Sequence, residues 1–295
     1  MRYFVTGATG WIGSAVVPEL LNAGHQVLGL TRSDAGADAL AAMGADVHRG
    51  DLTDLASLRA GAAATDGVVH LAYHHDFSQM AEAARMDQAA QAALGEELVG
   101  TGKPLFFASG VVGLAVGRPG TELDTPSASL HPRIAAGQAT LDLAERGVRS
   151  AAVRFAPTVH GAGDHGFIAT LVGVARQKGI SAYVGDGANR WAAVHQLDAA
   201  TLVRLALESA PGGSVLHATA EEGVPTRDIA EAIGRGLGLP VESVPAERAG
   251  EHFGWIGRFF AADAAVSSEI TRRTYGWEPT HPGLIADLEA GYYFK

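Results

Sequence analysis

The sequence predicts an α/β fold in which helices cover both faces of a parallel sheet, with a smaller α/β lobe towards the C-terminus. Three observations lead to this prediction. The chain opens on a short apolar run, a glycine-rich turn and a segment with helical spacing of apolar residues. Further apolar runs alternate with helical segments up to about residue 163. The runs are apolar throughout, which is typical of parallel strands buried on both faces.

Composition limits the class of protein. Of the 295 residues, 47% are hydrophobic and 18% are charged, which fits a compact fold with a substantial core. The formal net charge is −10 and no cluster of Lys or Arg occurs, so nucleic acid and anionic membranes are not expected partners. Cysteine is absent, which excludes disulfides and thiolate chemistry and favours a cytoplasmic location. We expect no signal peptide and no membrane-spanning segment.

The first fourteen residues form the most informative motif. Tyr3–Val5 is a short apolar run that fits a buried strand, and helical spacing begins at Trp11. Gly7 allows a tight turn, Gly10 lets a pyrophosphate approach the backbone, and Gly13 lets the helix pack closely on the strand. Free N–H groups at the helix start would then face the anion. We therefore expect a dinucleotide site at Gly7, Thr9, Gly10, Trp11, Ile12 and Gly13.

The spacing Gly-x-x-Gly-x-x-Gly, preceded by Thr6, resembles that of the short-chain dehydrogenase/reductase superfamily. The similarity points to its extended and atypical branches, which include the NAD-dependent epimerase/dehydratase-like proteins. It implies a Rossmann-type doubly wound sheet that binds a nicotinamide dinucleotide, followed by a smaller lobe that binds the substrate. The resemblance covers nearly the whole chain, although its specific motifs lie mainly in the first half.

The end of the second predicted strand, Gln26–Leu30, bears on the choice of cofactor. NAD sites usually carry Asp or Glu at this strand end, whereas NADP sites carry small residues and an arginine. Here Arg32 and Ser33 follow the strand, and the guanidinium fork of Arg32 can pair with a 2′-phosphate. We therefore expect NADP(H) rather than NAD(H), unless Arg32 is an ordinary surface arginine. Asp34 is expected to cap the next helix, over residues 34–43.

The third predicted strand ends in a second candidate cofactor contact. The resemblance implies that Asp51 contacts the adenine amino group and that Leu52 packs on the ring. Asp51 could instead only begin a turn, because aspartate favours such positions. A short helix is expected over residues 53–61, capped by Thr53 or Asp54.

Four polar residues follow the fourth predicted strand, residues 67–72. The resemblance implies that the end of this strand, Leu71 and Ala72, lies beside the cofactor. The four polar residues are Tyr73, His74, His75 and Asp76. Ligands of open parallel sheets bind beyond the carboxyl ends of the strands. A functional role, with Tyr73 as a proton donor and His74 as a substrate contact, competes with a role in capping the next helix. No metal is expected, because neighbouring side chains on an extended chain point to opposite faces.

The fifth strand carries the strongest catalytic candidate. A long alanine-rich helix over residues 76–100, interpreted as structural or as a dimer face, leads to strand 104–108 and then to Ser109. The resembled superfamily keeps a catalytic Ser or Thr at this position beside the cofactor. Its hydroxyl can hydrogen bond the substrate oxygen as negative charge develops. The alternative is a serine that binds the backbone in the turn before Gly110.

One feature of the family is missing. The familiar enzymes carry Tyr-x-x-x-Lys on the next helix, where Tyr donates a proton and Lys lowers its pKa and binds the ribose. No tyrosine of this chain is followed by Lys at that spacing. On the helix expected over residues 131–146, Arg133 falls near the Lys slot and Ser129 near the Tyr slot, and a small shift puts Arg133 in the Tyr slot. Arg133 cannot donate a proton at ordinary pH, but it can bind phosphate or ribose or stabilise an oxyanion.

Histidines are the other candidate proton donors. After the sixth strand, residues 150–155, His160 stands where the family has an aromatic residue near the nicotinamide. His165 lies in the glycine-rich loop 161–166. An unperturbed histidine pKa of about 6.5 allows either ring to give up a proton near neutral pH. A purely structural role is the alternative for each.

The remaining chain is expected to form the lobe and to return once to the sheet. We assign residues 1–163 and 189–211 to the dinucleotide-binding part, and residues 164–188 and 212–295 to the lobe. The segment before residue 196 resembles the crossing between the two parts in extended enzymes. By this resemblance the cleft is lined by Tyr183, Asn189, Arg190, Trp191 and His195.

Four further elements are expected after the crossing. Asp198 is expected to cap a helix over residues 199–209. Strands over residues 214–218 and 241–244 flank a helix over residues 226–237. The aromatic residues of the last segment could line an apolar substrate pocket, but they more often form the core of a small domain.

These features predict an NADP(H)-dependent oxidoreductase that transfers a hydride to or from a small organic substrate. A ketone or aldehyde is the first choice, and an imine or activated alkene stays open because the usual tyrosine is missing. One alternative is a regulator or redox sensor of the NmrA-like type, which keeps the nucleotide site without catalysis. A weaker alternative is a nucleotide-sugar epimerase or dehydratase, because those enzymes keep Tyr-x-x-x-Lys. A homodimer is left open.

Overall fold

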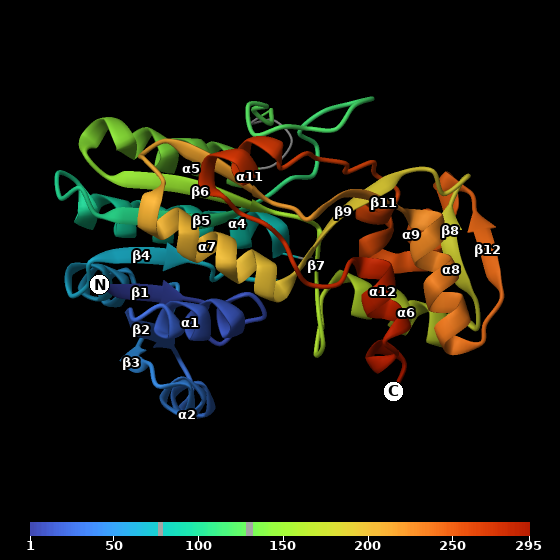
Figure 1. Ribbon diagram of the computed structural model, residues 1–295, viewed down its shortest axis with the longest axis horizontal. Coiled ribbons are helices and arrows are strands. Elements are labelled where there is room, and N and C mark those ends of the chain that lie inside the picture. Colours follow the sequence, from blue (N-terminus) through green and yellow to red (C-terminus); the bar gives the residue numbers. More distant parts are fainter. Residues whose placement is uncertain (76–78, 128–131) are drawn as a thin grey trace.

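The computed structural model describes residues 1–75, 79–127 and 132–295, and its larger part is built on a seven-stranded parallel sheet (Figure 1). The strands lie in the order β10-β6-β5-β4-β1-β2-β3, so the strand order reverses between β1 and β4. Such a reversal is the point at which ligands bind in open α/β sheets. The strands are β1 (Arg2–Thr6), β2 (Gln26–Thr31), β3 (Asp46–Arg49), β4 (Gly67–His70), β5 (Pro104–Gly110), β6 (Arg149–Phe155) and β10 (Ser214–Ala218).

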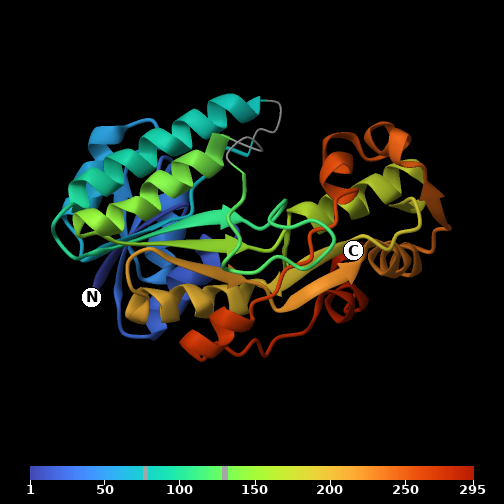
Figure 2. The same cartoon turned by 90° about the horizontal axis from the view of Figure 1, so that it is seen from above.

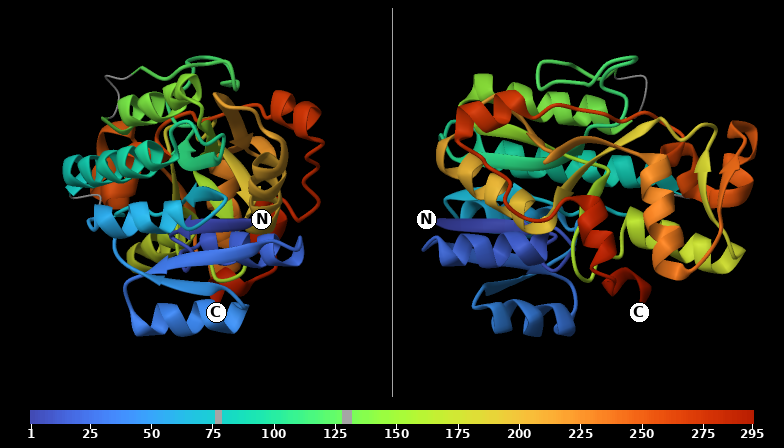
Figure 3. Two further views of the ribbon diagram at one scale, coloured as in Figure 1. Left: turned by 90° about the vertical axis from the view of Figure 1, so that its left-hand side faces the viewer. Right: turned by 45° about the vertical axis from the view of Figure 1, so that its right-hand side comes forward.

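Helices cover both faces of this sheet, as Figures 2 and 3 show. The alternation of side chains along the strands explains the two layers. Tyr3 and Val5 of β1 pack into one core with α1 and α7, whereas Phe4 between them packs into another core with α3 and α4. The helices are α1 (Gly13–Asn22), α2 (Asp34–Met43), α3 (Leu55–Ala63), α4 (Met80–Leu98), α5 (Pro132–Leu141) and α7 (Gln196–Ser209), and the 3-10 turn η2 (Asp142–Arg146) follows α5.

A smaller lobe lies beyond the carboxyl ends of the sheet strands (Figure 2). It contains a three-stranded sheet in the order β11-β9-β7 and a two-stranded sheet of β12 and β8. A separate core with buried Trp191, Phe253 and Phe260 holds it together. Its elements are β7 (Thr158–His160), α6 (Phe167–Lys178), β8 (Ser181–Val184), β9 (Arg190–His195), β11 (Glu221–Pro225), α8 (Thr226–Leu237), β12 (Val241–Val244), η3 (Ala246–Arg248), α9 (Ala249–Phe253), η4 (Gly254–Ile256), α10 (Gly257–Phe260), α12 (Leu284–Glu289) and η5 (Tyr292–Phe294).

One strand differs from the predicted division of the chain. We assigned residues 212–295 to the lobe, but β10 is the edge strand of the large sheet and pairs in parallel with β6. The helix α11 (Glu269–Tyr275) packs against β10, and Trp277 is buried in the core of the large part. The C-terminal segment therefore contributes to both parts, because β10 pairs with β6 and α11 packs against β10.

Most predicted elements have the expected position, and the differences lie at their ends. The helix predicted over residues 131–146 ends at Leu141 as α5 and then tightens into η2. Asp34 is not the cap of α2, contrary to the prediction. Ser33 has an extended backbone, and its hydroxyl caps the helix by accepting a hydrogen bond from the Gly36 N–H at 3.1 Å.

The predicted cap of α7 is also wrong. Asp198 lies inside the helix, and His195 Nδ1 accepts the hydrogen bond from the Leu197 N–H at 3.2 Å. Asp198 is buried and accepts hydrogen bonds from the backbone N–H groups of Thr280 and His281. Its carboxylate therefore fixes the C-terminal chain against α7 instead of capping the helix.

Three predicted positions, Asp76, Ser129 and His131, lie outside the described residues. The long helix expected from residue 76 is described from Met80 onward, as α4. In the part of the chain that the structure describes, no helix combines the length and the apolar character needed to cross a bilayer.

Candidate dinucleotide and catalytic site

The glycine-rich turn between β1 and α1 has a shape that a bound pyrophosphate needs. Gly7 has a φ of +67°, and a Cβ there would lie 2.7 Å from the Ala72 nitrogen. A Cβ on Gly13 would lie 2.1 Å from the Gly7 carbonyl oxygen. Gly10 is exposed, and a Cβ there would meet only that same oxygen, at 3.2 Å. Gly7 and Gly13 therefore shape the turn, whereas Gly10 keeps its outer side open.

The start of α1 presents backbone donors at this turn. Within the described residues, the N–H groups of Trp11 and Ile12 have no protein acceptor, and the neighbouring Thr9 is exposed. Such groups at a helix N-terminus suit phosphate oxygens. The Trp11 ring fixes the segment, because its Nε1 donates to the Val159 carbonyl at 2.7 Å and the His165 ring packs edge-on against it at 5.7 Å. The residues present thus fit the phosphates of a dinucleotide.

Arg32 and Asp51 stand at the ends of the neighbouring strands β2 and β3. The Arg32 side chain is 82% exposed, and its Nη1 lies 3.7 Å from Asp51 Oδ2. Asp51 Oδ1 accepts hydrogen bonds from the N–H and the hydroxyl of Thr53, at 3.0 and 2.9 Å. The Thr53 N–H, helped by the Arg32 charge, holds the pKa of Asp51 below its usual value despite partial burial. Asp51 thus begins a turn, and its contact with adenine, like that of the partly buried Leu52, stays a prediction.

The chain after β4 meets the glycine turn, and the end of β5 lies beside it. The backbone of Ala72 is so close to Gly7 that a side chain there would collide with it. Leu71, Ala72 and Tyr73 are partly exposed, as is Ser109 near the end of β5. Because β4 and β5 are paired in parallel, their carboxyl ends lie side by side. The structure therefore brings Tyr73 and Ser109 to the same edge of the sheet, next to the turn.

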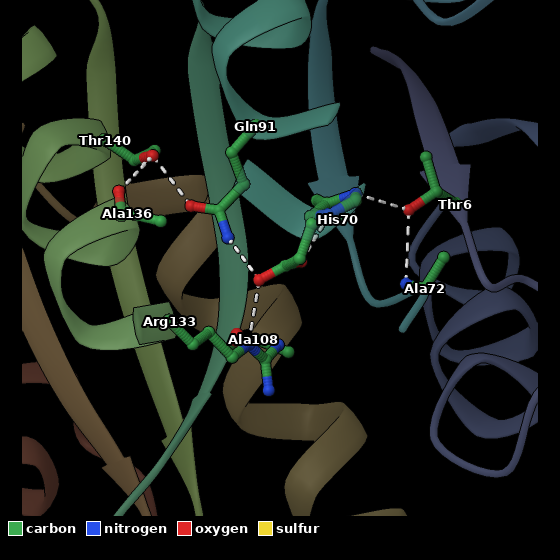
Figure 4. Close-up of polar contacts among 9 residues, drawn as sticks. Thr6, His70, Ala72, Gln91, Ala108, Arg133, Ala136 and Thr140 are labelled. Carbon is green, nitrogen blue, oxygen red and sulfur yellow. Dashed lines mark hydrogen bonds and ion pairs between the residues drawn. The ribbon is translucent and has the colours of Figure 1, made fainter. Parts of the chain in front are cut away.

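A buried polar network connects β1, β4, α4 and α5 behind this edge (Figure 4). Its members are Thr6, His70, Asp87, Gln91, Arg133 and Thr140. Thr6 Oγ1 lies 2.8 Å from His70 Nδ1, and His70 Nε2 lies 3.2 Å from Asp87 Oδ1. Gln91 donates to Asp87 at 2.9 Å, and the Thr140 hydroxyl donates to the Gln91 side-chain oxygen at 2.7 Å. The network thus ties two helices to two central strands.

The partners of His70 fix its proton positions. Burial raises the pKa of Asp87, but the hydrogen bond from His70 and the charge of Arg133 outweigh it, so this pKa lies below its usual value. Asp87 is therefore a carboxylate, and His70 Nε2 donates to it. The Thr6 hydroxyl accepts the Ala72 N–H at 3.3 Å and has its own proton left for His70 Nδ1. His70 therefore joins Asp87 to Thr6, with Nε2 on the carboxylate and Nδ1 on the hydroxyl.

Arg133 extends the buried polar network to the surface of the site. Its Nε donates to Asp87 Oδ2 at 2.9 Å, and its Nη2 donates to the Ala108 carbonyl at 2.7 Å. The guanidinium carbon lies 4.2 Å from the centre of the Tyr73 ring. Arg133 therefore touches the residue before Ser109 and the ring of Tyr73 at once. Its predicted contact with cofactor or oxyanion stays a prediction.

His160 is buried at the end of β7. Its Nδ1 lies 2.7 Å from Asp287 Oδ2, and the His195 ring packs edge-on against it at 5.5 Å. Among the described residues, its Nε2 has no hydrogen-bond partner. His165 and His74, in contrast, are exposed. No group of three or more His, Asp or Glu side chains within the described ranges is arranged to hold a metal.

Comparison with known proteins decides the classification. The model of the NAD-dependent epimerase/dehydratase family matches residues 3–217. The chain belongs to this family. An uncharacterized protein of Schizosaccharomyces pombe is 48% identical over 295 residues and covers 100% of both chains. An uncharacterized protein of Saccharomyces cerevisiae is 42% identical and covers 99% of both chains.

A solved structure shows the same fold as this member of the epimerase/dehydratase family. The UDP-glucose 4-epimerase of Thermus thermophilus, in complex with NAD, has a TM-score of 0.77 and 22% identity, over 100% of this chain and 98% of that chain. This chain thus shares with that structure its Rossmann-type sheet and its smaller C-terminal lobe, as the resemblance to the superfamily implied.

The predicted substrate residues of this family member do not all meet at the site. The Arg190 guanidinium forms an ion pair with Asp263 at 2.8 Å. Trp191 is 1% exposed and belongs to the core of the lobe, because the alternation along β9 turns its side chain inward. Tyr183 lies on β8 under the Arg227 guanidinium, at 4.9 Å. Tyr183 and Trp191 are thus placed in the lobe, away from the paired ends of β4 and β5.

Sequence reasoning missed the partners that hold Arg133. Asp87 and Gln91 lie one turn apart on the alanine-rich helix α4, and His70 lies in an apolar strand. All three are buried. The sequence feature that could have indicated these residues is a polar side chain on an otherwise apolar face of a helix or strand. Such a group needs a hydrogen-bonding partner when it is buried. The identity of that partner depends on how α4, α5 and the sheet pack together.

Proposed function

We propose that this family member is an NADP(H)-dependent oxidoreductase that reduces a ketone or an aldehyde. The observation that carries the proposal is the meeting of the glycine turn, Tyr73 and Ser109 at one edge of the sheet. The Ser109 hydroxyl would hydrogen bond the substrate oxygen while negative charge develops on it. When bound, the cofactor supplies the hydride. Imines and activated alkenes are kept as secondary substrate classes.

The choice of NADP(H) is supported by the end of β2. Arg32 is largely exposed there, and no carboxylate occupies the strand tip where an NAD site would have one. Asp51 lies next to Arg32, but its Oδ1 is engaged by Thr53. A 2′-phosphate would bring two or more negative oxygens to the guanidinium fork, which suits bidentate pairing.

A nucleotide-sugar epimerase is the second candidate, because a UDP-glucose 4-epimerase with bound NAD shares the fold. The missing Tyr-x-x-x-Lys speaks against it. A non-catalytic NADP(H)-binding regulator is the third candidate, and the same missing pair favours it. The three candidates differ in one observable, which is whether reduced nicotinamide is consumed, recycled unchanged during conversion, or only bound.

The test is NADPH consumption, followed by absorbance, with panels of aldehydes, ketones, imines, activated alkenes and nucleotide sugars. Ser109→Ala should lower kcat/KM by about 10²–10³-fold, because it removes a hydrogen bond to the developing oxyanion. Ser209→Ala is the matched control, since the Ser209 hydroxyl is exposed and bonds only the Leu205 carbonyl of its own helix. Tight NADPH binding without consumption on any panel would overturn the oxidoreductase. Conversion of a nucleotide sugar would then identify the epimerase, and no conversion would leave the regulator.

A further inference from the structure

We propose that Tyr73 is the proton donor of the reaction and that Arg133 is the residue that positions its ring and stabilises its phenolate. This inference rests on the proposed function. The family pattern supplies a phenol and a cation from one turn of a single helix. Here the cation still comes from that helix, α5, but the phenol comes from the chain after β4.

The geometry places the pair at the reacting edge. The Arg133 guanidinium carbon lies 4.2 Å from the centre of the Tyr73 ring, which is a cation–π stack. The same guanidinium donates to the carbonyl of Ala108 at 2.7 Å. Ser109 is the next residue along β5. Arg133 thus contacts the Tyr73 ring and the backbone directly before Ser109, which places both residues beside one fixed cation. In the proposed reaction, a substrate oxygen held by Ser109 takes its proton from this neighbouring phenol.

The buried polar network holds both members of the pair. Arg133 Nε is bound at 2.9 Å by Asp87, which is 1% exposed and ionised. At the other end of the network, the Thr6 hydroxyl binds the backbone N–H of Ala72, the residue before Tyr73, at 3.3 Å. His70 joins the two ends. The network therefore fixes the guanidinium and the chain that carries the phenol relative to each other.

The environment of the Tyr73 ring favours the protonated phenol, chiefly through burial. Burial raises the pKa of Tyr73, the Arg133 charge lowers it, and the Asp87 charge raises it, with a net increase above the usual value. His75 packs edge-on against the Tyr73 ring at 5.3 Å. Burial and the charges of Arg133, His165 and His74 lower the pKa of His75. A protonated phenol is the form that donates, and the nearby cation stabilises the phenolate that is left.

The step balances as a carbonyl reduction. The carbonyl carbon accepts a hydride from the reduced nicotinamide, and the π electrons of the carbonyl bond move to the oxygen. This oxygen takes the hydroxyl proton of Tyr73, which becomes a phenolate. The phenolate regains a proton from water, and the alcohol and the oxidised nicotinamide leave.

The first test is Tyr73→Phe, which keeps the ring under Arg133 and removes only the hydroxyl. The kcat for carbonyl reduction should fall by about 10²–10⁴-fold, while NADPH affinity measured by calorimetry stays unchanged. Tyr275→Phe is the control, because Tyr275 lies on α11 and its hydroxyl contacts Ser214 of the edge strand. If Tyr73→Phe retains the wild-type kcat, the proposal is overturned while the proposed function stands.

The second test needs no turnover and no nucleotide. The protein is labelled with difluorotyrosine, whose phenol is more acidic than that of tyrosine, and each phenol is titrated by fluorine NMR. Tyr73→Phe identifies the signal of residue 73. In Arg133→Met this signal should titrate about one pH unit or more higher, because a neighbouring cation favours the phenolate. Arg133→Lys keeps a cation and should restore most of the shift.

The results of these tests distinguish the interaction between Tyr73 and Arg133 from the proposed carbonyl reduction. An unchanged titration of residue 73 in Arg133→Met overturns the role of Arg133. If Arg133→Met does not fold, Arg133→Lys and Tyr73→Phe still decide, since a fully active Tyr73→Phe excludes Tyr73 as the donor. If wild-type protein consumes no NADPH on any panel, the proposed function fails and Tyr73 is not a donor, whatever the titration shows.

Discussion

His160 and Asp287 form a buried link between β7 and the last helix of the lobe. His160 Nδ1 lies 2.7 Å from Asp287 Oδ2, and the two residues are 0% and 5% exposed. The two residues lie far apart in sequence, and their link closes the C-terminal helix α12 onto the chain that leaves the sheet. A carboxylate in this position is costly to bury unless it keeps its partner.

We expect Asp287→Asn to lower the free energy of unfolding by about 1–2 kcal/mol at neutral pH, because His160 then has a neutral amide oxygen as acceptor instead of a charged carboxylate. Burial raises the pKa of Asp287, but the bond with His160 and the nearby histidine charges lower it more. Since the folded pKa lies below the unfolded one, this stabilisation is present at neutral pH and is lost as the pH falls below about 5. Urea unfolding across this range measures it.

The variant should therefore lose less stability on acidification than the wild type. Asp38→Asn, an exposed change on α2, is the control and should follow the wild-type pH curve. Parallel acid curves for Asp287→Asn and the wild type would show that the link contributes nothing that depends on ionisation.

The second prediction concerns the glycines of the turn, where one substitution should affect both stability and dinucleotide binding and another should affect binding alone. Gly13→Ala should destabilise the fold by about 1–3 kcal/mol and abolish binding, because its Cβ would lie 2.1 Å from a backbone oxygen. Gly10→Ala should abolish dinucleotide binding in calorimetry with little change in thermal stability, since its nearest contact is 3.2 Å. Gly173→Ala on α6, which meets nothing within 4 Å, is the control. Unimpaired NADPH binding by Gly10→Ala would show that the cofactor phosphates do not bind at this turn.

The turn also shows what the sequence could predict. Gly7, Gly10 and Gly13 act through local geometry, so their spacing, together with the strand before them and the helix after them, predicts where the fold starts and where phosphates are expected to bind. Ser109 could be placed for the same reason, because it stands at the end of a recognisable apolar strand. These features depend on residues that are neighbours in the chain, and local patterns therefore identify them.

Other features depend on packing between distant segments. Trp191 faces the core of the lobe because of the register of β9, and one residue of shift would turn it towards the core of the large part, where Ala192 and Val194 now lie. Arg133 stood out as a departure from the family pattern, but its partners Asp87 and Tyr73 come from other elements. The edge strand β10 joins β6 only after the chain has passed through elements of the lobe. No local pattern in the sequence reports these contacts.

The third prediction concerns Asp87, which binds Arg133, His70 and Gln91. Asp87→Ala should lower the free energy of unfolding by about 3–5 kcal/mol, because Arg133 is left as an uncompensated, partly buried charge. Glu82→Ala lies on the same helix and breaks only an exposed ion pair with Arg85, so it should cost about 1 kcal/mol or less. Chemical unfolding compares the two. Equal losses in both variants would show that the buried polar network does not stabilise the fold.

The fourth prediction concerns Arg32 and the choice between NADPH and NADH. Arg32→Ala should weaken NADPH binding roughly 10–100-fold, since one charge-assisted pair with a phosphate is lost, and should leave NADH binding unchanged. Arg235→Ala removes another exposed arginine, which pairs with Glu289 in the lobe, and should alter neither affinity. Calorimetric titration with both nucleotides separates the two roles of Arg32. A loss that is equal for NADPH and NADH would mean that Arg32 acts on a group common to both, and the preference for NADPH would then need another residue near the ribose.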